Sequence, residues 1–147
     1  MKALLVPLAI ASTISTVAAW GQDYCKQIFS VALRGGKTQV IRRITSTSTH
    51  CAPLFQGIEA IDIFEGPPEV SLTSEPGKVR TSKAGHDCPD PVPGAVVSIT
   101  AKNVTEYKEG ILTFRVRMNT KGGSASQTAR YRLLLYPARA GDPSTAA

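Results

Sequence analysis

The sequence predicts an all-β protein, an antiparallel sandwich or small barrel of about six to seven strands. Short stretches of alternating apolar and polar residues, bounded by Gly, Pro, Asn and Asp, recur along the chain. No stretch of a dozen or more residues shows the periodicity of an amphipathic helix. The length of 147 residues, with 42% hydrophobic and 19% charged residues, suits one globular domain.

The first nineteen residues, Met1–Ala19, have the pattern of a secretory signal peptide. A positive charge at Lys2 is followed by a short apolar stretch and then by small residues that end in Val17-Ala18-Ala19. The apolar stretch is shorter than the roughly 20 residues that span a bilayer, and Pro7 interrupts it. The alternative is a buried N-terminal helix. The signal pattern indicates a periplasmic or secreted protein with no integral membrane segment.

The remaining chain is expected to form a single β domain over residues 20–136. The last residues, 137–147, are rich in Pro, Gly and Ala and are expected to be a disordered tail. The expected strands, in chain order, are residues 28–33, 39–45, 57–64, 70–73, 96–104, 111–119 and 128–136.

Turn-forming residues lie between these expected strands. Gly35-Gly36 can adopt the positive φ of a tight hairpin turn, so the first two strands are expected to pair. Gly66-Pro67-Pro68 ends the third strand, because proline has no amide hydrogen to donate to a ladder. Residues 81–94 contain three Pro and two Gly and predict a long irregular loop.

The last two strands predict a hairpin. Every second residue is apolar in 111–119 and again in 128–136, and residues 120–127 are small and polar. Pairing centred between Gly123 and Ser124 puts Phe114 opposite Leu133 and all apolar side chains on one face, as a half-buried sheet requires.

Three cysteines allow one disulfide with one thiol left over, in a compartment where disulfides persist. Cys51 and Cys88 both lie in turn-rich segments and are the preferred pair, with Cys25–Cys51 as the rival. Zinc held by His50, Cys51, His86 and Cys88 is a further alternative. It has poor ligand spacing, because adjacent residues rarely bind one ion. The expectation is therefore no metal.

The expected register of the hairpin brings arginines together on its polar face. Arg115 would lie opposite Arg132, and Arg117 opposite Arg130, although like charges directly opposed across a sheet are destabilising. A solvated face tolerates such pairs. The functional interpretation is a platform of guanidinium groups that binds carboxylates or phosphates.

Acidic and basic residues are segregated along the sequence. Residues 26–43 contain five basic and no acidic side chains, whereas residues 59–75 contain five acidic and no basic ones, among them Glu65 and Glu69. One interpretation is that the two stretches neutralise each other as neighbouring strands. The other is a two-signed surface that steers a protein partner.

Several function classes find little support in the sequence. The net charge of +6 and the 6% aromatic content are modest for nucleic-acid binding, and export separates the chain from most nucleic acid. No cofactor motif is present, so no cofactor is expected. No set of residues typical of a catalytic site is present either, and a small hydrolase built on His86, Asp87 and Glu side chains is the third hypothesis.

Residues 57–76 resemble a motif of a family of short, exported proteobacterial proteins. In that family an apolar strand ends in an aromatic residue, an acid and Gly-Pro-Pro, followed by Ser-Leu and a Pro. The matching positions here are Phe64, Glu65, Gly66, Pro67, Pro68, Ser71, Leu72 and Pro76. Some members resemble immunity proteins that accompany type VI secretion effectors. The resemblance implies a protein that binds and neutralises a toxic effector.

The sequence thus favours a non-enzymatic periplasmic binding protein, in its specific form an immunity or inhibitor protein whose partner is an exported toxin or enzyme. The candidate binding residues are Arg115, Arg117, Arg130, Arg132, Glu65 and Glu69. The alternative is an envelope-associated module that binds anionic glycan or lipid headgroups through the arginine face.

Signal cleavage after Ala19 predicts that the exported protein begins at Trp20. Intact mass spectrometry of the protein from the periplasm or medium would measure this directly. A mass that retains Met1–Ala19 would contradict the assigned compartment and the argument for a disulfide.

Overall fold

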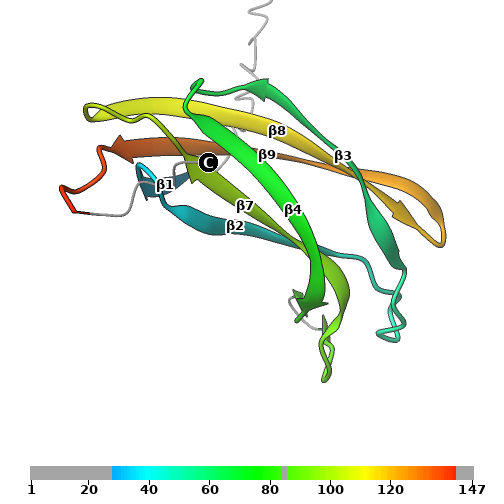
Figure 1. Cartoon of the computed structure of the whole chain (residues 1–147). Coiled ribbons are helices and arrows are strands. Elements are labelled where there is room, and N and C mark those ends of the chain that lie inside the picture. The colour runs from blue at the N-terminus through cyan, green and yellow to red at the C-terminus, as the bar shows by residue number, and fades with distance from the viewer. Residues whose placement is uncertain (1–27, 84–85, 142–147) are drawn as a thin grey trace, which may run out of the picture.

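The computed structural model describes residues 28–83 and 86–141. These form an all-β sandwich of two sheets packed face to face, with no helix in these ranges and neither sheet closed into a barrel (Figure 1). The predicted fold class is confirmed. The larger sheet has the order β1 (Phe29–Arg34), β9 (Gly123–Tyr136), β8 (Lys108–Thr120), β3 (Phe55–Glu65). The smaller sheet has the order β2 (Thr38–Thr45), β7 (Val92–Ala101), β4 (Val70–Val79).

The β8–β9 hairpin forms the centre of the larger sheet, but its predicted register is wrong by four residues. A two-residue turn, Lys121-Gly122, joins Thr120 to Gly123, which has a φ of 115°. Phe114 therefore pairs with Ala129 rather than with Leu133. The small polar residues expected to form the loop extend β9 instead. Because the shift is an even number of residues, every side chain keeps its predicted face.

The core lies between the two sheets and contains the predicted apolar faces. Phe114 is fully buried, and its ring stacks on that of Tyr131 with centroids 6.0 Å apart. Alternate residues of three strands supply most of the buried side chains: Leu112, Phe114, Val116 and Met118 from β8, Tyr131, Leu133 and Leu135 from β9, and Val97, Ile99 and Ala101 from β7. The alternate apolar residues that predicted these strands are the residues whose side chains are buried.

The hairpin predicted for the first two strands does not form. β1 and β2 belong to different sheets, and β1 runs parallel to β9, an exception to the expected antiparallel pairing. The turn carries the chain from one sheet to the other: the amide of Gly35 donates to the carbonyl of Tyr136, and that of Gly36 to the carbonyl of Ala101, both at 2.8 Å. Gly36 does adopt the expected positive φ, at 79°.

Two segments expected to be short or irregular form longer strands. β4 spans ten residues, and it tolerates Pro76 because it is an edge strand. The predicted loop over residues 81–94 contains the two-stranded ribbon β5 (Ser82–Lys83) and β6 (His86–Asp87), and also the start of β7. Gly94 is needed there, because a Cβ atom at this position would collide with the carbonyl oxygen of Ile44.

The structure pairs Cys51 with Cys88, as predicted. The sulfur atoms are 2.07 Å apart and the Cα atoms 5.6 Å apart. Each sulfur is bonded to the other, so neither is available as a zinc thiolate and the zinc alternative is wrong for this pair. Cys25 of the rival pair lies outside the described residues.

Several sequence predictions fall wholly or partly outside the described residues. The signal peptide, the start of the mature chain at residues 20–27 and the tail residues 142–147 belong to this group. Residues 137–141 are described and contain no strand. In the part of the chain that is described, no helix is long and apolar enough to cross a membrane.

Phe114→Ala is expected to lower the free energy of unfolding by about 3–5 kcal/mol, because it removes a fully buried ring from the core. Ser126→Ala, at an exposed position of β9, is the control and should change it by less than about 0.5 kcal/mol. Urea unfolding measures both variants. Similar losses at the two positions would contradict the assignment of faces.

Candidate functional site

The predicted opposition of arginines does not occur, because the hairpin register differs. Arg115 pairs with Thr128 and Arg117 with Ser126, whereas Arg132 pairs with Ile111. The two-residue turn at Lys121-Gly122 determines these pairings, and the charges of the arginines do not. The like-charge repulsion expected across the hairpin is therefore absent from these pairs.

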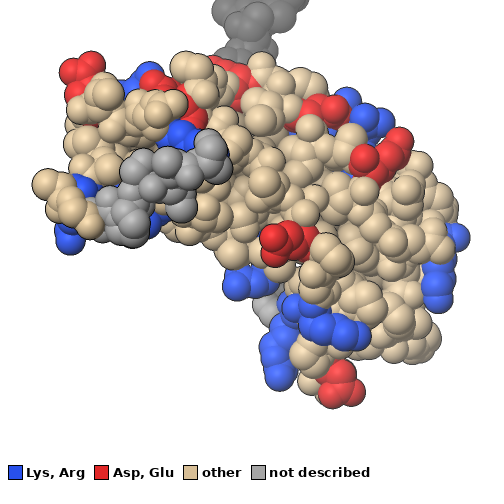
Figure 2. Space-filling model, in the orientation of Figure 1, with Lys and Arg blue, Asp and Glu red and all other residues tan. Residues whose placement is uncertain are grey.

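Arg115 and Arg117 instead converge on Asp62 of β3. Their guanidinium groups lie 3.1 and 3.0 Å from one carboxylate oxygen of Asp62, and Arg117 also reaches Glu59 at 3.3 Å. Hydrogen bonds from Arg115 and then from Arg117 lower the pKa of Asp62. Figure 2 shows acidic and basic side chains interleaved over the upper rim, where β3 and β8 lie. The acidic stretch is thus partly neutralised by arginines of β8.

Two further candidates are also held in ion pairs. Arg132 donates to Glu109 at 2.6 Å, and Lys108 donates to Glu69 at 2.7 Å. Hydrogen bonds from Tyr107 and Arg132 lower the pKa of Glu109, and the bond from Lys108 lowers the pKa of Glu69. Arg115, Arg117, Arg132 and Glu69 therefore already have partners of opposite charge within the chain.

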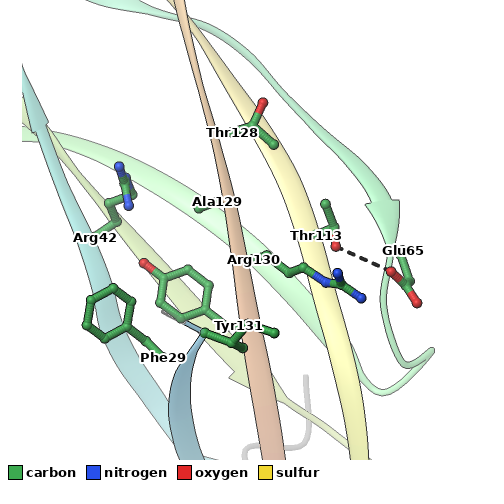
Figure 3. A pocket seen from close by; sticks show the side chains of 9 residues that line it. Phe29, Arg42, Glu65, Thr113, Thr128, Ala129, Arg130 and Tyr131 are labelled. Carbon is green, nitrogen blue, oxygen red and sulfur yellow. Dashed lines mark hydrogen bonds between the residues drawn. The ribbon is translucent and has the colours of Figure 1, made fainter. Parts of the chain in front are cut away.

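The remaining two candidates, Arg130 and Glu65, line a groove of about 620 Å³ on the edge of the sandwich. Its lining residues, which define the β9 groove, are Ile28, Phe29, Arg42, Glu65, Thr113, Thr128, Ala129, Arg130 and Tyr131. Thr113 donates to Glu65 at 3.3 Å. Within the described ranges neither Arg130 nor Glu65 has an ion-pair partner. Figure 3 shows the Arg130 side chain directed toward Thr113 and Glu65.

The floor of the β9 groove is apolar and aromatic. Phe29 is 59% exposed, and its ring lies 6.5 Å from that of the buried Tyr131. Tyr131 donates to the carbonyl of Ile41 at 3.2 Å, which fixes the ring between the sheets. A second hollow of about 340 Å³, lined by Val31, Gln39, Val40 and Ile41, shares Phe29 and Tyr131 with the groove.

Arg42 of β2 reaches the β9 groove from the opposite sheet. One of its terminal nitrogens donates to the side-chain oxygen of Gln127 at 3.1 Å. Its Nε atom is buried and has no hydrogen-bond partner in the described structure. Arg42 has no ion-pair partner among the described residues.

Sequence reasoning missed Phe29, Arg42 and Tyr131 as site residues. Their meeting depends on β1 and β2 belonging to different sheets, and the alternation within a strand carries no signal for that. Arg42 appeared only as one of several basic residues in residues 26–43.

The metal and hydrolase alternatives both depend on His, Cys, Asp and Glu side chains. No group of three His, Cys, Asp or Glu side chains lies close enough to hold a metal ion in the described part of the chain. His86 and Asp87, on which the hydrolase hypothesis depends, form β6, and their side chains are outside what the structure describes.

Comparison with protein families, with curated proteins and with solved structures finds no match to this chain. The resemblance of residues 57–76 to a family of exported proteins therefore stays an expectation.

Asp62→Asn is expected to make the stability of the protein less dependent on pH in the acid range. The folded pKa of Asp62 lies below its ordinary value of 3.8. The ionised carboxylate therefore stabilises the fold above about pH 3.8, and this contribution is lost as the pH falls through the folded pKa.

Urea unfolding at a series of acid pH values measures the effect. The double variant Arg115→Gln, Arg117→Gln should flatten the pH dependence in the same way, because it removes the groups that lower the pKa of Asp62. An unchanged pH dependence in both variants would show that the ion pairs do not form in solution.

Proposed function

We propose that this chain is an exported, non-catalytic binding protein that engages a protein partner through the β9 groove. In its specific form the partner is an exported toxin or enzyme, which the chain neutralises by binding. The observation that carries the proposal is the combination in one groove of an exposed Phe29 and an Arg130 with no ion-pair partner among the described residues.

The composition of the groove supports a protein partner. Aromatic residues and arginine are the residue types most enriched where protein interfaces concentrate their binding energy. Phe29 and Tyr131 form an apolar floor beside Arg42 and Arg130, so an apolar side chain and a charged group of a partner can be bound together. The disulfide between Cys51 and Cys88 supports export, because such bonds persist in oxidising compartments.

The alternative of an envelope-associated module has less support from the geometry. It needs arginines that are free to bind anionic headgroups, and Arg115, Arg117 and Arg132 already bind carboxylates of the chain. An anionic ligand would have to displace these partners.

A competing protein-binding site is the Gly-Pro-Pro corner at the end of β3. Ile63 and Phe64 are 47% and 58% exposed there, and the guanidinium of Arg115 lies 5.2 Å from the centre of the Phe64 ring. This surface lacks a hollow comparable with the β9 groove among the described pockets. A substitution at Phe64 can therefore test this corner separately from the β9 groove.

Arg130→Gln is expected to weaken binding of the partner by roughly thirtyfold, the equivalent of about 2 kcal/mol for a desolvated arginine contact. Arg132→Gln is the matched control, because it removes the same charge two residues along the same strand from a side chain that binds Glu109. The partner is first captured from the native periplasm with the whole protein and identified by mass spectrometry. Its affinity for each variant is then measured by calorimetry.

Phe64→Ser separates the two surfaces, because Phe64 lies at the Gly-Pro-Pro corner and does not line the β9 groove. Loss of binding with Phe64→Ser but not with Arg130→Gln would move the site to the Gly-Pro-Pro corner. If the whole protein captures no protein and instead binds peptidoglycan or anionic vesicles in a salt-sensitive way, the proposal is wrong and the envelope alternative is favoured.

A further inference from the structure

The β9 groove runs beside a length of strand that has a neighbour on only one side. β9 pairs with β8 along residues 123–135, but β1 pairs only with the half of β9 from Tyr131 to Tyr136. The other half, Gly123–Arg130, has no strand partner on this side among the described residues. We call these eight residues the open edge.

The direction of the backbone groups on the open edge follows from one hydrogen bond. The carbonyl of Tyr136 accepts from Gly35, so it faces the β1 side of the strand. Backbone groups alternate in direction along a strand, and hence Ser124, Ser126 and Thr128 also direct their N–H and C=O groups to that side. All three residues are exposed.

The open edge lacks the features that protect other edges of this fold. Natural proteins block edge strands with prolines, bulges or charged side chains. β4 contains Pro76, β2 has a register shift between Val40 and Arg42, and β3 has three register shifts. The open edge consists of Gly, Ser, Ala, Gln and Thr up to Arg130, and its pairing with β8 shows no register shift.

We propose that the partner binds by strand addition: an extended, acidic segment of the partner pairs with the open edge and continues the sheet beside β1. This inference rests on the proposed function and names the form of the ligand. Strand addition to an exposed sheet edge is an established mode of peptide recognition, in which main-chain hydrogen bonds supply affinity and side-chain pockets supply specificity.

The excess of positive over negative side chains in the groove favours an acidic segment. Two arginines, Arg42 and Arg130, line it against one carboxylate, that of Glu65. Neither Arg42 nor Arg130 has an ion-pair partner in the described chain. Alternate side chains of an added strand would face the solvent side, near Arg130, and the apolar side, near Phe29 and Tyr131.

The test uses a capped octapeptide of alternating valine and glutamate as the probe, with the valine–lysine octapeptide as its charge control. Binding to the whole protein is followed by amide chemical shifts and hydrogen exchange. The valine–glutamate peptide should slow exchange at Ser124, Ser126 and Thr128, and the lysine peptide should bind at least about tenfold more weakly, as loss of one charge-assisted contact implies.

Thr128→Pro removes an outward N–H of the open edge without removing a bond to β8. It should weaken peptide binding by about tenfold or more, since the amide is lost and the ring obstructs pairing. Thr128→Val is the matched control, because it changes the same groove-lining side chain but keeps the amide. Binding that is about tenfold weaker in Thr128→Pro than in Thr128→Val measures the contribution of the amide. Urea unfolding of both variants separates loss of binding from loss of folding.

The outcomes distinguish this inference from the proposed function. Equal binding of the peptide, and of the identified partner, by Thr128→Pro and Thr128→Val would overturn strand addition while leaving the groove as the binding site. Slow exchange at Ser124, Ser126 and Thr128 in the protein alone, at concentrations where it is monomeric, would also overturn it, because the chain would already cover the edge itself. Slow exchange that appears only on dimerisation would assign the edge to a second copy and overturn the partner.

Discussion

The two-residue turn at Lys121-Gly122 is the constraint on which the larger sheet depends. By pairing Thr120 with Gly123 it sets every cross-strand neighbour of the β8–β9 hairpin. It puts Ala129 beside Phe114 and leaves room for the Tyr131 ring to stack on Phe114. A slip of one residue would turn these buried side chains to solvent, at a cost that no surface interaction could offset. The same turn determines that Arg130 lies beside Thr113, at the groove, and not opposite Arg117.

The groove itself is a consequence of unequal strand lengths. β9 has fourteen residues, whereas β1 has six and covers only one half of it. The turn at Gly35-Gly36 fixes which half is covered, because its amides bond to Tyr136 of one sheet and Ala101 of the other. The chain then passes to the smaller sheet, and Arg42 of β2 reaches back toward Gln127 across the uncovered end. A site thus arises where two sheets meet and, among the described residues, no strand closes the gap.

The fold class, most of the strands, the buried faces and the Cys51–Cys88 pair could be predicted from the sequence. Each depends on a local pattern: alternation decides which side chains are buried, and turn-rich segments give cysteines the freedom to meet. The register of the hairpin and the separation of β1 from β2 could not be predicted, because alternation specifies a face and not a neighbour. This limit also explains the candidate site. Of the six predicted binding residues, Arg130 and Glu65 line the groove. The four others have partners that depend on the strand order or, for Arg132, on the hairpin register.

The surface ion pairs bear on recognition more than on stability. Exposed pairs such as Arg115–Asp62 and Arg132–Glu109 contribute little to the free energy of folding. They partly neutralise the outer face of the larger sheet, whereas Arg42 and Arg130 at the groove have no ion-pair partner among the described residues. Charge of this kind steers association and selects among partners, whereas desolvated aromatic contacts and backbone hydrogen bonds supply most of the affinity. The arginines of the groove would therefore select an acidic segment. Phe29, Tyr131 and the open edge would supply the contacts that bind it.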